Sequence, residues 1–372
     1  MPLNTIPNKG LTSRGYPSDR LVTPIIINGD MSVAQRGTSA TGKTGSGIYA
    51  VDRMNLGIDS LGTWTVTQET ISSGEAYNNG FTKAFRVDCT TADASPAASD
   101  NIFFNTKFEG QNLQAIKKGT SNAESLTISF YVKSNKTGTG QVLLQDKDNS
   151  RNVGKTYTIN SANTWEKKVL SFPADTTGAF DNDNAKSLEI EWALDAGSNF
   201  TSGTLPATWT SSNNNQRAVN NFSLGDSTDN DWAITGLQLE VGEFDSTTIP
   251  SFPFESFASN LLKCQRYFYQ IQGNDSANTL LGIGSNNDAS SAQSYLKFPT
   301  TMRSTPSITS SSGLKTGDGN SYTRDATGVS VDSGSNIQMS VNIAASTLTV
   351  FRVAFNVLSN SADSHLALSA EL

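Results

Sequence analysis

Hydrophobic and polar residues alternate with a period of two in several short segments of this chain. In residues 125–133 and again in residues 187–194, the apolar side chains fall on one face of an extended strand and the polar ones on the other. The predicted inward positions are Leu126, Ile128, Phe130, Val132, Leu188, Ile190, Trp192 and Leu194. One packed and one polar face are typical of the strands of an antiparallel β-sandwich.

Further segments of strand character are separated by polar sequence rich in turn-forming residues. Strands are predicted at residues 24–27, 49–53, 63–68, 83–87, 102–109, 141–147, 163–173 and 231–242. Residues 37–47 are rich in glycine, threonine and serine, which predicts a loop. Residues 111–119 predict one short helix that ends at the capping glycine Gly119.

The pattern changes after Gly242. Residues 255–270 are the best helical candidate, although their closing Tyr-Phe-Tyr is also compatible with the start of a strand, and short strands follow at residues 295–298, 337–342, 348–356 and in the tail. The predicted fold is all-β: a jelly-roll β-sandwich followed by a short helix and a second, smaller β-domain. The predicted parts are an extended N-terminal arm (1–23), the jelly roll (24–245), a helical connector (246–270) and the small β-domain (271–372).

The composition indicates a folded chain that does not bind nucleic acid. Its 372 residues include 18 Phe, 9 Tyr and 5 Trp, which is far more aromatic content than disordered chains carry. The net charge of −7 argues against contact with phosphates, which requires a basic face. The N-terminus lacks an apolar signal region, and no apolar run approaches the ~18–20 residues that span a bilayer. We therefore expect synthesis in the cytoplasm and no membrane insertion.

Several residues that carry chemistry in other proteins have simple structural interpretations here. Residues 37–44 match the P-loop pattern, but no buried strand precedes them and the glycine-rich sequence that follows is unsuited to a helix. The single histidine, His365, lacks partners for a zinc site or a catalytic triad. Cys89 and Cys264 fall in different predicted parts of the chain and are expected to be buried free thiols.

Acidic residues are the remaining candidates for catalysis or metal binding. Glu189 and Glu191 lie about 6–7 Å apart on one face of a predicted strand, but neighbours on one strand point in parallel and do not flank a bond. They are expected on a solvated face, where they are candidate ligand-binding residues. Two clusters, one of Asp146, Asp148 and Asn149 and one in residues 181–184, offer oxygens for calcium or form plain turns. We expect no catalytic residue, no required cofactor and no established metal ligand, with calcium as the open alternative.

Aromatic residues outside the core are candidates for stacking against sugars. Trp192 and Trp232 are in phase with buried positions and are assigned to the core. Tyr131, on the polar face of its strand, and Trp209, in a polar loop, are expected to be more exposed. With Glu189 and Glu191, they complete the predicted ligand-binding set.

The strand series resembles carbohydrate-binding modules of the jelly-roll type. A fuller resemblance, over about residues 24–270, is to tail-fibre-like virion structural proteins of marine tailed bacteriophages. Its motifs are residues 26–37 (IINGDMSVAQRG), 125–133 (SLTISFYVK), 157–165 (YTINSANTW), 175–184 (DTTGAFDNDN), 236–242 (GLQLEVG) and 264–269 (CQRYFY). The resemblance implies a structural or receptor-facing role and carries no established ligand residues with it.

The sequence is compatible with three functions. The favoured one is a phage tail fibre or appendage in which the arm docks on other virion proteins and the sandwich faces a host surface glycan, with trimers raising avidity. The second is a capsid-surface decoration or architectural virion protein that binds no glycan. The third, a glycan depolymerase, requires opposed carboxylates in a groove. The chain is thus expected to be a non-enzymatic component of the virion, assembled in the host cytoplasm.

Overall fold

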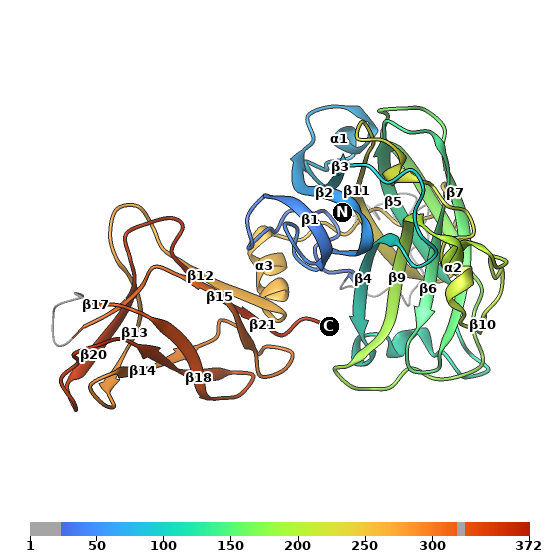
Figure 1. Cartoon of the computed structure of the whole chain (residues 1–372). Coiled ribbons are helices and arrows are strands. Elements are labelled where there is room, and N and C mark those ends of the chain that lie inside the picture. The colour runs from blue at the N-terminus through green and yellow to red at the C-terminus, as the bar shows by residue number, and fades with distance from the viewer. Residues whose placement is uncertain (1–23, 318–323) are drawn as a thin grey trace, which may run out of the picture.

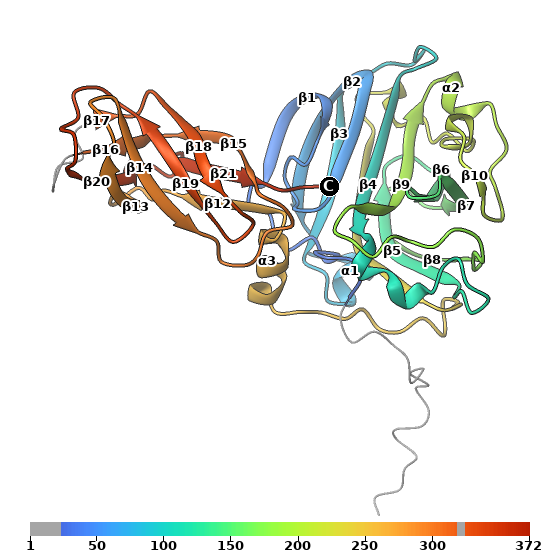
Figure 2. The ribbon, with the colours of Figure 1, turned by 90° about the horizontal axis from the view of Figure 1, so that it is seen from below.

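The computed structural model describes residues 24–317 and 324–372, so the predicted arm, residues 1–23, lies outside the described part of the chain. Two β-rich units follow one another, with helix α3 (Phe257–Gln265) between them (Figure 1). From below, the C-terminus is seen to return from the second unit toward the strands of the first (Figure 2). The predicted all-β class, with a sandwich followed by a short helix and further strands, is confirmed.

The first unit consists of antiparallel strands joined by short helices and turns. Its strands are β1 (Ser39–Gly47), β2 (Asn55–Thr70), β3 (Lys83–Thr91), β4 (Asn101–Glu109), β5 (Leu126–Ser134), β6 (Gly138–Asp146), β7 (Arg151–Ile159), β8 (Glu166–Phe172), β9 (Lys186–Ala196), β10 (Thr210–Ser211) and β11 (Asp231–Val241). Its helices are α1 (Gly74–Asn78) and α2 (Ser198–Thr201), with 3-10 turns η2 (Gly110–Asn112), η3 (Gln114–Ile116), η4 (Asn214–Gln216) and η5 (Leu224–Asp226).

Strand β2 belongs to both layers of the sandwich. Its residues 55–60 pair with β4, and its residues 63–70 pair with β3. Between the two halves, Ser60 and Gly62 have φ values of 56° and 64°. A Cβ atom on Gly62 would lie 2.4 Å from the carbonyl oxygen of Thr91, so only glycine fits this bend.

The strand order defines a front layer and a back layer. The front layer is β10-β7-β6-β9-β4 with the first half of β2, and the back layer is the second half of β2 followed by β3-β11-β5-β8. Strand β1 pairs with β2 outside this order.

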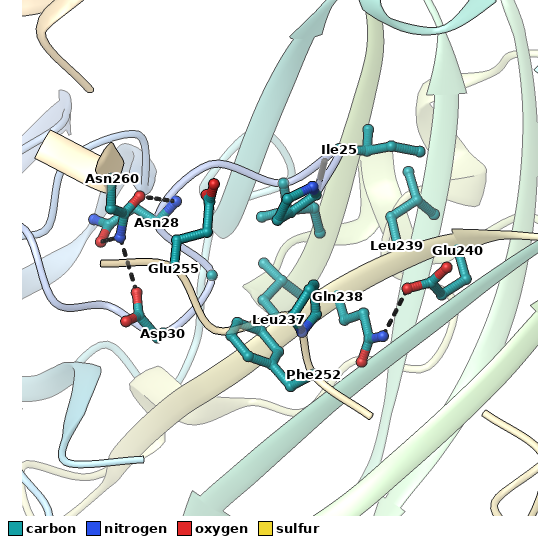
Figure 3. Close-up of a pocket in the computed structure, with 14 residues that line it drawn as sticks. Ile25, Asn28, Asp30, Leu237, Gln238, Leu239, Glu240, Phe252, Glu255 and Asn260 are labelled. Carbon is teal, nitrogen blue, oxygen red and sulfur yellow. Dashed lines mark hydrogen bonds between the residues drawn. The ribbon is translucent and has the colours of Figure 1, made fainter. Parts of the chain in front are cut away.

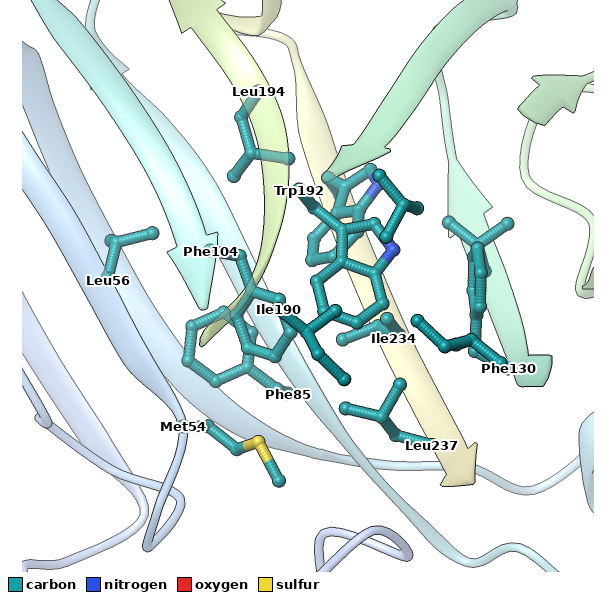
Figure 4. Close-up of a cluster of buried hydrophobic side chains, with 14 of the residues drawn as sticks. Met54, Leu56, Phe85, Phe104, Phe130, Ile190, Trp192, Leu194, Ile234 and Leu237 are labelled. Atoms are coloured by element: carbon teal, nitrogen blue, oxygen red, sulfur yellow. The ribbon is translucent and has the colours of Figure 1, made fainter. Parts of the chain in front are cut away.

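Aromatic side chains from both layers meet in the core (Figure 4). The rings of Phe130 on β5 and Trp192 on β9 are 5.5 Å apart at 89°, and those of Phe104 on β4 and Trp232 on β11 are 5.4 Å apart. All eight predicted inward residues belong to this core, so the alternation predicted the sandwich interior correctly. Cys89 and Cys264 are buried free thiols, as expected.

Four local predictions in the first unit are wrong, and the strand predicted at residues 348–356 begins only at Val353. Residues 24–27 and 49–53 form bends and turns, although Ile26, Ala50 and Val51 are buried in the core. The predicted loop at 37–47 is mostly strand β1, because pairing with β2 outweighs the poor strand propensity of its glycines. The predicted helix at 111–119 is divided between the 3-10 turns η2 and η3.

Helix α3 is shorter than predicted. It begins after Ser256, whose side chain accepts a hydrogen bond from the backbone of Ser259, and buries Asn260 and Cys264 one turn apart. The Tyr-Phe-Tyr sequence, predicted as the helix end or a strand start, leads into strand β12. The Asn260 amide bonds to Asn28, which holds the helix against the first unit.

The second unit has its own core and two small antiparallel sheets. Its strands are β12 (Phe268–Gln272), β13 (Thr279–Asn286), β14 (Ser291–Lys297), β15 (Ser307–Ser312), β16 (Leu314–Thr316), β17 (Arg324–Asp325), β18 (Gly328–Gly334), β19 (Gln338–Ala344), β20 (Val353–Leu358) and β21 (His365–Ser369). The sheets have the orders β12-β21-β15 and β17-β16-β20-β13-β14-β19-β18. Buried side chains such as Leu296, Val341 and Leu366 form the core between them.

Buried charged groups join the two units. The Glu109 carboxylate, at the end of β4, accepts hydrogen bonds from Arg266 at 2.6 and 2.7 Å and from the Tyr267 hydroxyl at 2.5 Å. Burial raises the pKa of Glu109, but the hydrogen bonds from Arg266 and Tyr267 outweigh it, and the pKa lies below its usual range. Glu371, near the C-terminus, pairs with Arg36 and Arg53 of the sandwich.

Asp52 makes the stability of this junction depend on pH. Its carboxylate is buried beside Arg36 (3.2 Å) and Gln35 (2.5 Å). Burial raises the pKa of Asp52 to about 6, although Arg36 and Gln35 oppose the shift. The folded state therefore favours protonated Asp52. This contribution to the free energy of unfolding is full below pH ~4 and is lost as the pH rises through about 6.

We expect the Asp52→Asn substitution to abolish the decrease in the free energy of unfolding that the ionisation of Asp52 causes as the pH rises. The amide mimics the protonated acid, so the variant should keep the free energy of unfolding that the wild type loses between pH 4 and 7, roughly 2–3 kcal/mol at ~1.4 kcal/mol per pKa unit. Denaturant unfolding at several pH values measures the difference. Asp88→Asn, at a partly exposed carboxylate beside Arg86, is the control and should keep the wild-type slope. An unchanged slope in the Asp52 variant would assign the effect to another group.

Candidate functional site

The outer face of the back layer is polar in sequence but largely covered in the structure. Ser129, Tyr131 and Lys133 point outward from β5, opposite the inward Phe130 and Val132. The prediction that Tyr131 is exposed is wrong, since its side chain is only 5% exposed. Helix α1 and the segment after β11 cross this face, which strand alternation does not reveal.

Aromatic rings from these crossing segments pack over Tyr131. The Phe81 ring lies 5.4 Å from Tyr131, 4.9 Å from Phe252 and 5.0 Å from Phe254. A bulge in β11 at Gly236, where φ is 62°, allows this approach, because a Cβ atom there would lie 2.8 Å from Phe81.

One pocket, which we call the aromatic pocket, opens beside this cluster with a volume of about 300 Å³. Strands β5, β8 and β11 supply Ser129, Tyr131, Lys167, Gly236 and Gln238. The walls are Asn79, Phe81, Ile249, Ser251, Phe252 and Phe254. Phe254 is half exposed, so part of this aromatic side chain is accessible beside an amine, amides and hydroxyls.

A second pocket, the Trp165 pocket, lies on the other side of α1 and has a volume of about 480 Å³. Its lining includes Trp165, Lys133, Glu69 and Glu75. The Lys133 ammonium lies 5.1 Å from the Trp165 ring and donates to Glu69 at 2.8 Å. The pocket therefore combines a tryptophan with charged and hydroxyl groups.

A third, small cavity lies under the start of the described chain (Figure 3). Its lining includes Ile25, Leu237, Phe252 and Glu240, and its volume is about 20 Å³, enough for about one water molecule. Because Gln238 and Phe252 also line the aromatic pocket, this cavity lies directly behind it.

Burial and the nearby Glu75 raise the pKa of Tyr131 to about 12. Its hydroxyl is therefore protonated at neutral pH and is neither a base nor a nucleophile. The pocket chemistry of this residue is that of a hydrogen-bonding phenol.

The prediction that Glu189 and Glu191 lie on a solvated face is wrong. Glu191 is 1% exposed, and Arg217 donates to both of its oxygens at 2.6 and 2.9 Å. The segment after β9 brings this arginine across the front layer. Lys147 and Lys186 contact Glu189 at 3.1 and 3.4 Å, and they hold its pKa below the usual range although burial raises it.

Trp209 is half-buried against the core, and its indole N–H donates to the carbonyl oxygen of Pro173 at 2.8 Å. Tyr131 is the one predicted ligand residue that lines either pocket, and the structure does not bring it together with the other three. Their role as ligand residues stays a prediction.

The Lys118 ammonium contacts the carboxylate of Asp146, one of the candidate calcium ligands. It contacts Asp146 at 2.5 Å, Asp175 at 2.9 Å, and the carbonyl oxygens of Thr177 and Gly178 at 3.0 and 2.8 Å. Its side chain is 2% exposed. A cation thus already balances the Asp146 carboxylate, while Asp148, the neighbouring candidate, accepts from the Asp181 backbone.

Other candidate chemistry has a structural explanation. The P-loop match falls on strand β1, not on a strand–loop–helix turn. His365 contacts the Ser310 hydroxyl and the Asp363 carbonyl oxygen, each at 3.0 Å. Across residues 24–317 and 324–372, no group of three His, Cys, Asp or Glu side chains is arranged to hold a metal ion. Over the same residues, no helix is long and apolar enough to span a membrane.

No protein-family model and no curated protein matches this chain. The enzymatically active domain of tailspike protein 4 from bacteriophage CBA120 is 12% identical over 59% of this chain and 21% of its own, with a TM-score of 0.29. This chain therefore spans about a fifth of that structure. A putative sugar binding protein from Bacteroides thetaiotaomicron is 12% identical over 59% of this chain and 100% of its own, with a TM-score of 0.31.

A family 11 carbohydrate-binding module from Clostridium thermocellum, solved with a β-1,3-1,4-mixed-linked tetrasaccharide, is 11% identical over 55% of this chain and 95% of its own, with a TM-score of 0.25. At these values, function has to be argued from the residues of this chain.

Sequence reasoning missed Lys167, Gln238, Phe252 and Phe254. The last two lie outside any strand, where hydrophobic periodicity gives no signal. Gly236, inside a strand pattern, was the available clue, because an interior strand glycine often marks a bulge or a close approach.

We expect Lys118→Met to destabilise the sandwich by about 3–5 kcal/mol, because removing one partner leaves buried carboxylates unpaired. Denaturant unfolding measures the loss. The control is Lys117→Ala, one residue earlier, where an exposed ion pair with Glu124 is worth under ~1 kcal/mol. If both substitutions lower the free energy of unfolding by the same small amount, the buried contacts of Lys118 contribute little to stability.

Proposed function

We propose that this protein is a bacteriophage virion component, a tail fibre or other appendage, whose sandwich binds a host-surface glycan. The aromatic pocket is the observation that supports binding. The virion setting is supported by the motif resemblance over residues 24–270.

A sugar fits the aromatic pocket for chemical reasons. Pyranose rings present C–H faces that pack on aromatic rings and hydroxyl groups that hydrogen-bond. Phe254 offers the first kind of contact, and Asn79 and Lys167 offer the second. Lys167 projects from the paired strand β8, and the Phe254 ring packs on Phe81 and Phe252. Both groups are therefore held in place before the ligand arrives, which reduces the entropic cost of binding.

Attachment to the particle belongs to the same proposal. The N-terminal arm, residues 1–23, would dock on other virion proteins after assembly in the host cytoplasm. A homotrimer would present three pockets toward one surface and strengthen weak single contacts through effective concentration.

A capsid-surface decoration or architectural virion protein is the second candidate. It is supported by large exposed apolar side chains on the second unit, including Ile283, Tyr295, Phe351 and Val353. Such residues suit a broad protein interface. This candidate requires no glycan.

The proposed activity is binding without catalysis. A depolymerase requires two carboxylates in a groove. Glu69 and Glu75, which both line the Trp165 pocket, are the residues to examine for such an activity. Glu69 is held by Lys133 at 2.8 Å and lies 3.6 Å from Arg86, an arrangement that suits a fixed ion pair. Release of reducing sugars from host polysaccharide by the purified protein would contradict the binding-only proposal.

We expect the purified full chain to bind at least one host polysaccharide on a glycan array, and Phe254→Ala and Lys167→Ala each to weaken that binding about five- to tenfold. Each removes one stacking or hydrogen-bonding contact worth roughly 1–1.5 kcal/mol. Isothermal titration with the identified glycan measures the affinity.

Two residues of β14 provide matched controls. Tyr295→Ala and Lys297→Ala remove an exposed ring and an exposed amine far from the pocket, and affinity should stay within twofold. Binding to isolated capsids with no binding to any glycan would overturn the receptor proposal in favour of the capsid decoration.

A further inference from the structure

A separate polar cleft of about 710 Å³ lies between the sandwich and the second unit. One wall is the loop before β1, with Gln35 and Arg36, and the other is the sheet β12-β21-β15. It shares no lining residue with the aromatic pocket or the Trp165 pocket.

The sheet wall is polar because its strands alternate. Ile271 and Tyr269 of β12 pack on the core of the second unit, as does Leu366 of β21. The alternate residues of β12, Gln270 and Gln272, line the cleft.

Register brings three hydrogen-bonding side chains into one row. Gln272 pairs with His365, and His365 pairs with Ser312 on the other side. Directly opposed side chains lie about 4.5–5.5 Å apart between Cβ atoms, so an amide, an imidazole and a hydroxyl are regularly spaced along this row. The ring nitrogens of His365 also contact the Ser310 hydroxyl and the Asp363 carbonyl oxygen, and the Gln272 amide contacts Gln270 and the Ala362 carbonyl oxygen. Ser310 and Gln270 lie two residues before Ser312 and Gln272 on the same strands, and they extend the polar surface.

The charge of the cleft points to an uncharged ligand. Arg36 is its cation, and Asp52 and Glu371 balance it at 3.2 and 3.1 Å. The Arg36 guanidinium also lies 3.5 Å above the Phe268 ring, which fixes it as a flat surface at the base of the cleft. Asp363 is the carboxylate at the rim, so an anionic ligand would meet repulsion there.

We propose that this cleft is a second binding site, for a neutral oligosaccharide. Amides and hydroxyls at regular spacing match sugar hydroxyls, and the volume suits a few sugar units. The ion pairs from Glu371 and Glu109 hold the two walls together, so the site is preformed. This site is independent of the aromatic pocket and does not require it.

His365 provides a direct test because it is the single histidine of the chain. The full-length protein, labelled with ¹³C and ¹⁵N in histidine, is titrated with neutral hexasaccharides of glucose, xylose and mannose and with an anionic uronic-acid hexasaccharide. We expect at least one neutral hexasaccharide to shift the ring resonances saturably, and the uronic-acid hexasaccharide to cause no shift. No shift with any neutral probe, or a shift with the anionic probe alone, would overturn the proposal.

Variants distinguish the cleft from nonspecific effects. Ser312→Trp should fill the cleft and weaken the response at least tenfold, while Ser333→Trp, at an exposed position on β18, should leave it unchanged. Ser310→Ala removes the hydroxyl contact to His365 without adding bulk and should weaken binding about threefold or more. An undiminished response in both cleft variants would place the ligand elsewhere.

The outcome is separable from that of the proposed function. Phe254→Ala should leave the His365 titration unchanged even though it weakens binding at the aromatic pocket. If Phe254→Ala weakens glycan binding and no glycan shifts the His365 resonances, the proposed cleft site is rejected and the aromatic pocket is supported. A His365 response without an effect of Phe254→Ala would support the cleft and reject the aromatic pocket.

Discussion

The double pairing of strand β2 is the constraint on which the sandwich depends. Because its two halves pair with β4 and β3, the register of both layers is set from one strand. The bend between the halves requires the left-handed backbone of Ser60 and Gly62. Once the layers are placed, Phe130 meets Trp192 and the inward residues form one core. The same arrangement determines which side chains form the outer face of the back layer, where the aromatic pocket and the Trp165 pocket lie.

The interior was predictable from sequence because burial on one face imposes a period of two. The outer faces were not, because alternation says which side chains point outward and nothing about what later crosses them. Glu191 is covered by an arginine 26 residues further along the chain. Tyr131 is covered by Phe81, which lies 50 residues before it. The alternation therefore predicted correctly that these side chains point away from the core. It predicted wrongly that they are exposed to solvent.

Secondary-structure predictions from local composition were wrong where long-range contacts determine the structure. The glycine-rich segment 39–47 has low strand propensity, yet β2 supplies backbone partners for it. Residues 24–27 have high strand propensity but form turns, and their side chains still reach the core. Of the candidate site, sequence pointed to Tyr131 and to the bulge glycine Gly236. Phe252 and Phe254 follow the last sandwich strand, where no periodicity identifies a wall residue.

Buried charges are paired across long stretches of sequence, and this pairing determines which polar surfaces remain for ligands. Glu109 with Arg266 and Arg53 with Glu371 join the two units, and Lys118 with Asp146 fastens a turn to the sandwich. Each pair restrains two segments, because separating it would leave a buried charge uncompensated. The groups that line the aromatic pocket and the polar cleft between the two units are mainly amides, hydroxyls and aromatic rings. A framework held by internal ion pairs leaves openings lined largely by uncharged hydrogen-bonding groups, and this division of charge is what the proposed binding of neutral, hydroxyl-rich ligands rests on.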